Sequence, residues 1–587
     1  MKKDMKAYNT IYNTILCGVA AIALSSCGDF LDKLPDERVE ITTEDQVVML
    51  LTTGYSAANY GWICELSSDN LIDVNSPFYA PQTDGTEIRV YYNLSSYERM
   101  DDEAFKFEPV ESSTDTDSPS AIWEYCYNAI ATANHALEYI EEFKEEAGGT
   151  MSSTLAAAYA EALLIRAYHH FILVNVFSQA WKNEEDSKND IGVPYVTETE
   201  SDLVKEYERS NVADTYAKIE EDLIEGLTYV SDINYDYPKW HFNVNAAKAF
   251  AARFYLYKRD YEKVIEYADD VLGTDRSALS SKLMDCSGFD DATSSTDYAE
   301  IWQGPDEANN LLLMATYSLQ FRRTIGYRYA FAGDPLQSVM MRTGPTWNWT
   351  ILPIAMVAGE TFYDGTIDHG FTSARVCERF EYTDKVAGIG YAHVVRREFT
   401  CAELLLERVE ALILGRGDYE TAVEDLIAYE ASRQSFSDDN YTYYSASNAM
   451  KDLTMAIVQS YYDPSTSNYN VLDDWSFTQN MSSDFVVPEE MYTYMNALND
   501  FKRYETAFTG RRFFDLKRWG MEWSHTYGDA ESSTTVTLAW DDERRAIEVP
   551  QEVLAAGLSS SYDPVQVSNT SSASTASTYS GAKYVSK

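Results

Sequence analysis

Asp260-Tyr-Glu-Lys-Val-Ile265 and Asp418-Tyr-Glu-Thr-Ala-Val423 are two copies of one short pattern. Each copy follows a stretch with helical periodicity, residues 246–257 and 400–414, and each begins a second such stretch. A helix, a turn with an acidic–aromatic pair and another helix together form a helical hairpin. One hairpin cannot bury its apolar face alone, so hairpins stack on their neighbours. The two copies therefore predict a mostly α-helical chain built on stacked hairpins.

This hairpin pattern is typical of tetratricopeptide repeats, so we expect a tetratricopeptide-like α/α superhelix. The two copies lie far apart in the sequence, so the scaffold is not a uniform solenoid. Apolar residues at helical spacing predict five helices before the second copy. These helices cover residues 121–143, 155–177, 212–230, 245–257 and 260–272.

Two segments have little helical pattern. Residues 273–396 and, further on, 435–484 are rich in Gly, Pro, Ser, Thr and aromatic residues, which favours irregular loops with a few short strands. Helical pattern returns over residues 489–523, and residues 545–549 resemble a strand that runs into Pro550.

These changes of texture divide the chain into five parts. We expect a signal peptide, a hairpin-bearing N-terminal region, a loop-rich insertion as the ligand-binding lobe, a C-terminal region with the last hairpin and a closing helix, and a Ser-rich tail. Their predicted ranges are 1–26, 27–272, 273–396, 397–558 and 559–587.

The N-terminus has the parts of a secretory signal. Lys2, Lys3 and Lys6 precede an apolar run over residues 15–24, which is too short to cross a bilayer that needs ~20 residues. Leu-Ser-Ser then leads directly to Cys27, the order found in bacterial lipoprotein signals. We expect Cys27 to be the first residue of the mature protein and to carry the lipid anchor. The alternative is an ordinary signal peptide cut at another bond.

Composition excludes one class of partner. The 587 residues carry a formal net charge of −48, whereas nucleic-acid binding needs clustered Lys and Arg. An acidic surface suits neutral partners such as sugars. Beyond Cys17 and Cys27, the five remaining cysteines are far apart and never spaced C-x-x-C, so we expect isolated core residues.

No enzyme signature is found in the sequence. It lacks a phosphate loop, a G-x-S-x-G nucleophile elbow and an H-E-x-x-H zinc helix. His169 and His170 lie in an apolar helix, which favours packing over metal ligation. We therefore expect no catalytic residue, no cofactor and no bound metal. A glycoside hydrolase stays open as an alternative, because it needs only two suitably spaced carboxylates.

Aromatic residues in the irregular segments are the best candidates for a binding site. A flat ring stacks on the apolar face of a pyranose, while polar neighbours bond its hydroxyl groups. The alternative is that these rings pin long loops to the helical body. The candidate ligand-binding residues are Trp62, Tyr79, Tyr92, Trp302, Trp347 and Trp349.

A run of motifs in a fixed order resembles the SusD/RagB-like nutrient-uptake lipoproteins of Bacteroidetes. The most recognisable is Gly510-Arg-Arg-Phe-Phe-Asp-Leu-Lys-Arg-Trp519, where Asp515 and Arg518 form an i, i+3 pair and the rings can face the core. We expect this segment to be a structural clasp. The other matching segments are residues 27–32, 166–177, 192–194, 209–223, 247–257, 401–411 and 549–552.

The resemblance implies a surface-exposed, lipid-anchored protein of the outer membrane. Members of this family bind a nutrient, usually an oligosaccharide, without cleaving it, and deliver it to a SusC-like TonB-dependent transporter. In them, tetratricopeptide-like hairpins form the scaffold and irregular loops carry the ligand. A peptide ligand is the alternative within the same family.

Overall fold

The computed structural model describes residues 41–81, 87–111, 116–199, 207–284, 294–332, 373–433, 453–465, 477–562, 574–575 and 584–586. The chain divides into two parts, Met1–Gln46 and Val47–Lys587. Of the first part, residues 41–46 are described.

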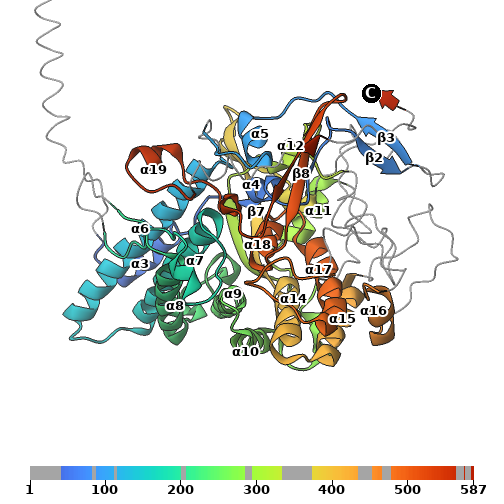
Figure 1. Cartoon of the computed structure of the whole chain (residues 1–587). Coiled ribbons are helices and arrows are strands. Elements are labelled where there is room, and N and C mark those ends of the chain that lie inside the picture. Colours follow the sequence, from blue (N-terminus) through green and yellow to red (C-terminus); the bar gives the residue numbers. More distant parts are fainter. Residues whose placement is uncertain are drawn as a thin grey trace, which may run out of the picture. The chain divides into compact units, whose positions relative to one another are not determined.

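Eight long helices form the scaffold, as Figure 1 shows. Helices that follow one another along the chain contact each other: α6 with α7, α7 with α8, α9 with α10, and α14 with α15. Contacts between α10 and α14 join the two halves of the scaffold. The bounds of these helices are α6 (Pro119–Glu146), α7 (Ser153–Phe177), α8 (Val212–Tyr229), α9 (Val244–Tyr257), α10 (Tyr261–Leu272), α14 (Cys401–Ala411), α15 (Tyr419–Arg433) and α17 (Tyr492–Thr506).

The two copies of the Asp-Tyr-Glu pattern start equivalent helices. The Asp260 carboxylate accepts the backbone N–H of Lys263 at 3.5 Å, and Asp418 accepts that of Thr421 at 3.2 Å. Each aspartate therefore satisfies a backbone donor that the first turn of a helix leaves free. The predicted pair of hairpins, α9–α10 and α14–α15, is confirmed.

A tight turn separates the helices of the second hairpin. Leu412–Arg416 form a π-helical turn, and Gly417 ends it with a φ of 61°. Gly415 in this turn lies against the first hairpin, because a Cβ atom at this position would be 2.6 Å from the Cβ of Tyr261.

Short strands form small sheets beside the scaffold. The largest has the order β4-β7-β6 and is antiparallel throughout. Its long strand β7 runs across residue 396, where we expected the insertion to end. Two other sheets have the orders β10-β9-β8 and β11-β3-β2, and β1 pairs with β5. The strands are β1 (Ile72–Asp73), β2 (Phe78–Pro81), β3 (Glu87–Tyr91), β4 (Asn310–Thr316), β5 (Tyr329–Ala330), β6 (Arg379–Asp384), β7 (Ile389–Thr400), β8 (Trp523–Gly528), β9 (Ser533–Leu538), β10 (Ser574–Thr575) and β11 (Tyr584–Ser586).

Shorter helices fill the connections. They are α3 (Glu44–Leu51), α4 (Gly61–Leu66), α5 (Arg99–Phe105), α11 (Ser295–Gln303), α12 (Gln320–Arg323), α16 (Met455–Tyr461), α18 (Arg511–Arg518) and α19 (Gln551–Ala555). Single 3-10 turns lie at Asp186–Lys188, Asp232–Asn234, Pro238–Trp240, Arg276–Ser281, Ala374–Val376, Glu489–Met491 and Glu543–Arg545.

The predicted strand over residues 545–549 is wrong. Arg545 ends a 3-10 turn, and its guanidinium donates to the carbonyls of Met521 and Leu516 at 2.9 and 2.6 Å. The backbone then runs extended without a strand partner among the described residues. A backbone hydrogen bond from the Ile547 N–H to the Val176 carbonyl, 3.0 Å long, links this extended segment to the end of α7.

The predicted helical pattern over residues 489–523 is broken. Phe508 and Gly510 have φ angles of 66° and 80°, which end α17 and start α18 in a new direction. A Cβ on Gly510 would lie 2.9 Å from the Cα of Gly61, so the close approach of α4 needs glycine here. The helical pattern ends at Arg518, and Trp523 begins β8.

Several predictions about single residues are confirmed. His169 and His170 are buried, and their Nδ1 atoms hydrogen-bond to the carbonyls of Ile165 and Arg166 within α7. The described cysteines, Cys64, Cys126, Cys377 and Cys401, are buried. None of the described helices combines the length and the apolarity needed to span a bilayer.

Candidate functional site

Four of the predicted site residues cannot be placed as side chains. Cys27, Trp347 and Trp349 lie outside the described residues. The backbone of Tyr79 lies in β2, opposite Arg89 of β3, and its side chain is not described. The roles expected for these four residues stay predictions.

Trp62 and Tyr92 are buried. Trp62 in α4 is 1% exposed, and its Nε1 donates to the Asp101 carboxylate at 2.8 Å. Tyr92 is 6% exposed and stacks on Phe78, with ring centroids 6.4 Å apart. Both rings pack chain segments together, which is the alternative role that the sequence left open.

Trp302 in α11 is also buried, and two guanidinium groups lie over its ring. The ring centroid is 4.2 Å from Cζ of Arg397 and 5.2 Å from Cζ of Arg375. Such contacts stabilise a desolvated cation through the electron-rich ring face. Trp302 therefore anchors a charged part of the interior and presents no face to solvent in the described structure.

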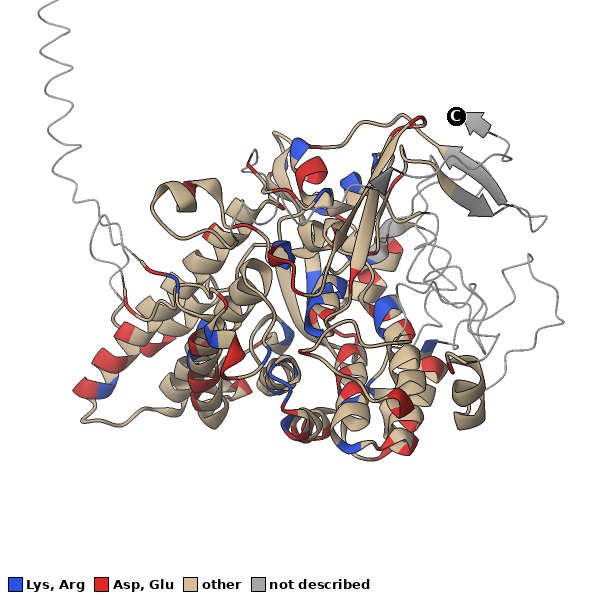
Figure 2. Cartoon of the chain, viewed as in Figure 1, with Lys and Arg blue, Asp and Glu red and all other residues tan. Residues whose placement is uncertain are grey.

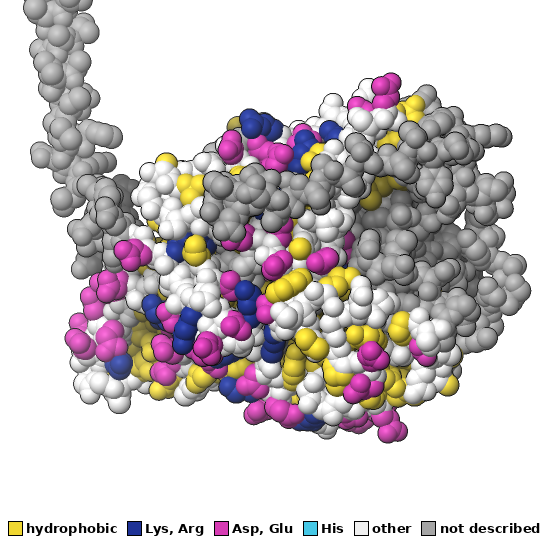
Figure 3. Space-filling view, viewed as in Figure 1, with side chains coloured by type: hydrophobic (Ala, Val, Ile, Leu, Met, Phe, Trp, Pro, Cys, Tyr) yellow, Lys and Arg dark blue, Asp and Glu magenta, His cyan; other side chains and the backbone are white. Residues whose placement is uncertain are grey.

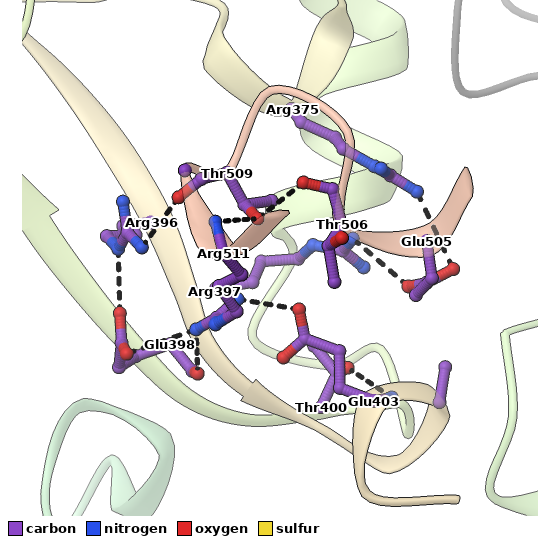
Figure 4. A network of polar contacts seen from close by, with 12 residues as sticks. Arg375, Arg396, Arg397, Glu398, Thr400, Glu403, Glu505, Thr506, Thr509 and Arg511 are labelled. Carbon is purple, nitrogen blue, oxygen red and sulfur yellow. Dashed lines mark hydrogen bonds and ion pairs between the residues drawn. The ribbon is translucent and has the colours of Figure 1, made fainter. Parts of the chain in front are cut away.

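The interior also holds an ion-pair network, which we define as Arg253, Arg396, Arg511, Glu398, Glu403 and Glu407. Figure 4 shows four of these residues, Arg396, Arg511, Glu398 and Glu403. Arg511 donates to Glu403 at 2.6 Å, and Arg396 donates to Glu398 at 2.7 Å. Arg253 reaches Glu403 and Glu407 at 2.9 and 2.7 Å. Three cations thus face three carboxylates, and together they join α9, β7, α14 and α18.

The predicted clasp forms a second cluster of buried charges. Arg518 donates to Asp515 and Glu410 at 2.7 and 2.6 Å. Trp519 Nε1 also donates to Glu410 at 2.8 Å, and Lys502 lies 3.0 Å from it. All these groups are buried, so the segment locks α18 onto α14 and α17 as expected. Figure 2 shows basic residues in the middle of the fold, around α18 and β7.

One exposed and two half-buried tyrosine rings lie together at the other end of β7. We call Tyr125 of α6, Tyr317 after β4 and Tyr391 of β7 the tyrosine face. Tyr391 is 37% exposed and meets Tyr317 edge-on, with centroids 5.3 Å apart and an interplanar angle of 87°. The Tyr125 and Tyr317 centroids are 6.0 Å apart.

The other face of the β6–β7 hairpin also carries exposed rings. Phe380 and Tyr382 are 49% and 51% exposed, with ring centroids 4.8 Å apart. Their partners on the neighbouring strand are Ala392 and Gly390. Because alanine has a small side chain and glycine has none, the two rings stay uncovered. Because side chains alternate along a strand and Tyr391 lies opposite Glu381, Tyr391 lies on the face opposite these two rings.

The hairpin turn explains why these strands pair in this register. The Asp384 carboxylate accepts the backbone N–H groups of Val386 and Ala387 at 2.9 and 3.0 Å, and Gly388 adopts a φ of 68°. An aspartate that bonds its own following backbone, followed by a glycine with positive φ, is a typical turn. The turn fixes which residues of β7 lie opposite the rings of β6.

Comparison with known proteins gives one family match and several similar folds. Residues 29–256 match the family model described as SusD-like, starch-binding and associating with the outer membrane. Three solved structures are similar over most of the chain, each with 16% identity. They are a protein of Bacteroides vulgatus described as sugar-binding (TM-score 0.56, covering 89% of this chain and 99% of that one), a SusD superfamily protein of Bacteroides fragilis (0.53, 89% and 99%) and another of Bacteroides thetaiotaomicron (0.52, 89% and 100%).

Residues 29–256 are therefore SusD-like in sequence. The solved structures show that the helical fold of this chain is shared. No curated protein matches its sequence.

The buried charged groups of the ion-pair network and of the clasp are arranged as ion pairs. Burial by itself would raise the pKa of the Glu398 carboxyl. The guanidiniums of Arg511, Arg396 and Arg253 outweigh burial and lower this pKa to about 2. Burial would also raise the pKa of Glu410. The Arg518 and Lys502 cations outweigh burial and lower the pKa of Glu410 to about 2. Both carboxylates are therefore ionised and paired at neutral pH, which suits a structural role and not proton transfer.

Tyr317 and Tyr391 are not among the binding residues predicted from the sequence, although the sequence holds a signal for the hairpin that carries Tyr391. Phe380-Glu-Tyr382 and Tyr391-Ala-His393 flank a turn containing Asp384 and Gly388. Aromatic residues alternating on both sides of such a turn are a hairpin signal. That signal would have pointed to a two-faced hairpin with rings on each face.

Proposed function

We propose that this protein is an outer-membrane lipoprotein that binds a nutrient glycan without cleaving it. The observation that carries this proposal is the match of residues 29–256 to a family described as starch-binding and associating with the outer membrane. The similar Bacteroides vulgatus protein, which is described as sugar-binding, supports it.

The tyrosine face is the binding surface in this proposal. A phenol ring offers a flat apolar face for a sugar ring and a hydroxyl group that bonds sugar hydroxyls. The chain as a whole is acidic, with 94 Asp and Glu against 46 Lys and Arg. Figure 3 shows acidic side chains spread over one face of the described surface. Such a surface favours a neutral oligosaccharide over an anionic one.

Attachment and delivery complete the proposed function. Cys27 carries the acyl chains that hold the protein on the outer membrane, where it is exposed at the cell surface. A SusC-like TonB-dependent transporter receives the bound glycan. The family's association with the outer membrane supports this part of the proposal.

Hydrolysis is the weaker alternative. A glycosidase needs one carboxyl with a raised pKa and a second that stays ionised, both reaching the substrate. Burial raises the pKa of Glu65 to about 7. Burial also raises that of nearby Asp69, but Arg503 and Arg512 lower it overall. Both side chains are buried and hydrogen-bonded inside the protein, which favours binding over cleavage.

Glycan binding by ring variants tests the proposal. The double variant Tyr317→Ala/Tyr391→Ala is titrated with soluble oligosaccharides in a calorimeter. We expect about tenfold weaker binding, which corresponds to ~1.4 kcal/mol. Tyr237→Ala is the matched control, because Tyr237 is 72% exposed on another element and should leave affinity unchanged.

Three results would contradict this assignment. Equal loss of affinity in the control would remove the tyrosine face as the site. New reducing ends after incubation with a glycan library would show a hydrolase. Binding of peptides in place of any glycan would favour the peptide-binding alternative.

A further inference from the structure

One buried carboxylate is shared by three guanidinium groups. Glu505 of α17 lies 2.7 Å from Arg433, 3.5 Å from Arg375 and 3.9 Å from Arg397, measured between nearest oxygen and nitrogen atoms. The Tyr429 hydroxyl also donates to it at 2.7 Å. No other described carboxylate lies within ion-pair distance of Arg375 or Arg397. Among the described residues, Arg375 and Arg397 therefore have one carboxylate between them, unlike the three cations and three carboxylates of the ion-pair network.

Arg375 and Arg397 keep hydrogen-bond donors without acceptors. Nε and Nη2 of Arg375 and Nη1 of Arg397 have no hydrogen-bond partner in the described part of the chain. Their side chains are only 3% and 8% exposed. Arg375 does use Nη1, which donates to the carbonyls of Tyr504 and Ala507 at 3.1 Å each. Buried donors normally have acceptors, so these unsatisfied groups require an explanation.

A small cavity lies among these groups. Its volume is about 30 Å³, and Arg375, Arg396, Arg397 and Arg511 line it. Glu403 is the only acidic residue in its lining, and it is already paired with Arg253 and Arg511. A cavity of this size has room for one or two small occupants and excludes a sugar ring.

The occupant should be negatively charged. Water can accept hydrogen bonds from the arginines, but it does not neutralise their charge. An uncompensated buried cation is unfavourable, and burial lowers the pKa of Arg397 only to about 10, so it stays charged at neutral pH. The surplus of positive charge is notable in a chain whose net charge is −48.

We propose that a small inorganic anion, chloride, binds in this cavity between Arg375 and Arg397. The anion accepts the unused N–H groups and neutralises part of the charge that Glu505 leaves. It thereby ties the 3-10 turn at Ala374–Val376 and strand β7 to the end of α17. The site is separate from the tyrosine face and does not depend on the proposed glycan binding.

Thermal unfolding of the full-length protein tests this site. The protein is compared in sodium chloride and in sodium gluconate at equal ionic strength, since gluconate is too large for the cavity. Because a ligand that binds only the folded state raises Tm, we expect Tm to be at least ~2 °C higher in chloride. Arg397→Met should abolish this difference. Arg416→Met is the control, because Arg416 pairs with Glu262 at the surface and is 44% exposed, and it should keep the difference.

Crystals soaked in bromide give a second readout that needs no variant. We expect an anomalous peak within hydrogen-bond distance of Arg375 and Arg397. Equal Tm values in the two salts overturn the proposal, and so does the absence of a bromide peak in the cavity. A chloride effect that survives in Arg397→Met would also overturn it, since the stabilising ion would then bind elsewhere.

Discussion

The two ends of strand β7 differ sharply although they belong to one strand. Arg396–Thr400 lies inside the protein, where its charged side chains pair with α9, α17 and α18. Ile389–His393 projects at the surface and carries Tyr391 of the tyrosine face. The inner end holds elements together, and the outer end presents rings to solvent. Mutations in the first should therefore alter stability, and mutations in the second should alter binding.

The largest expected effect is at the inner end. Glu398→Gln removes the carboxylate that faces Arg396 and Arg511, so buried Arg396 loses its ion-pair partner and Arg511 keeps Glu403. Breaking a buried pair in this way costs ~3–5 kcal/mol of unfolding free energy, which denaturant titration measures. Glu262→Gln breaks the exposed pair with Arg416 and is the control, for which we expect little change in the midpoint. Similar losses in both variants would contradict the difference between buried and exposed charges.

An intermediate effect concerns pH. Burial raises the pKa of Glu65 to about 7, above the value near 4.3 expected in the unfolded chain. The contribution of this group to stability is full below the unfolded pKa and is lost as pH rises through about 7. We expect the free energy of unfolding to fall by ~1–3 kcal/mol across this window.

The variant Glu65→Gln checks the origin of this loss. It removes the titrating group and keeps one oxygen to accept the Gly510 N–H, which Glu65 accepts at 2.9 Å. The variant is less stable at low pH, because its amide nitrogen meets Asn70 Nδ2, a donor to the native carboxylate. Its stability should nevertheless vary less between pH 5 and 8 than that of the unmodified protein. An unchanged pH profile would show that another group is responsible.

The smallest effect on stability is expected at the outer end. Tyr391→Ser removes a ring that is 37% exposed, and surface substitutions usually change stability by less than ~0.5 kcal/mol. Chemical denaturation of this variant should therefore match that of the unmodified protein. A loss as large as that of Glu398→Gln would show that the ring is part of the interior and would erase the contrast between the two ends.

The scaffold was predictable from the sequence because it repeats local rules. Apolar spacing and the aspartate caps at Asp260 and Asp418 predicted the helices of both hairpins, and the Asp515–Arg518 spacing predicted the clasp. The prediction of a strand at residues 545–549 was wrong, because the residue pattern of one segment does not reveal whether a partner strand exists. Arg545 instead bonds carbonyl groups that are remote in sequence.

The candidate site was harder to predict because burial depends on tertiary contacts. Trp302 has the composition of a binding residue, but it lies under Arg375 and Arg397, whose positions depend on the folding of β7 and of the turn before it. Tyr391 and Tyr317 come from different elements and meet only when β4 and β7 pair. The expected roles of Cys27, Tyr79, Trp347 and Trp349 stay predictions.

Gly415 has a consequence for how such a chain can diversify. Because Gly415 has no side chain, the second hairpin can pack directly against Tyr261 of the first. More than a hundred residues separate Gly415 from Tyr261 in the sequence. The intervening segment connects α10 to α14, and these two helices contact each other. Insertions and deletions in the segment between the two hairpins therefore need not disturb the contact between α10 and α14.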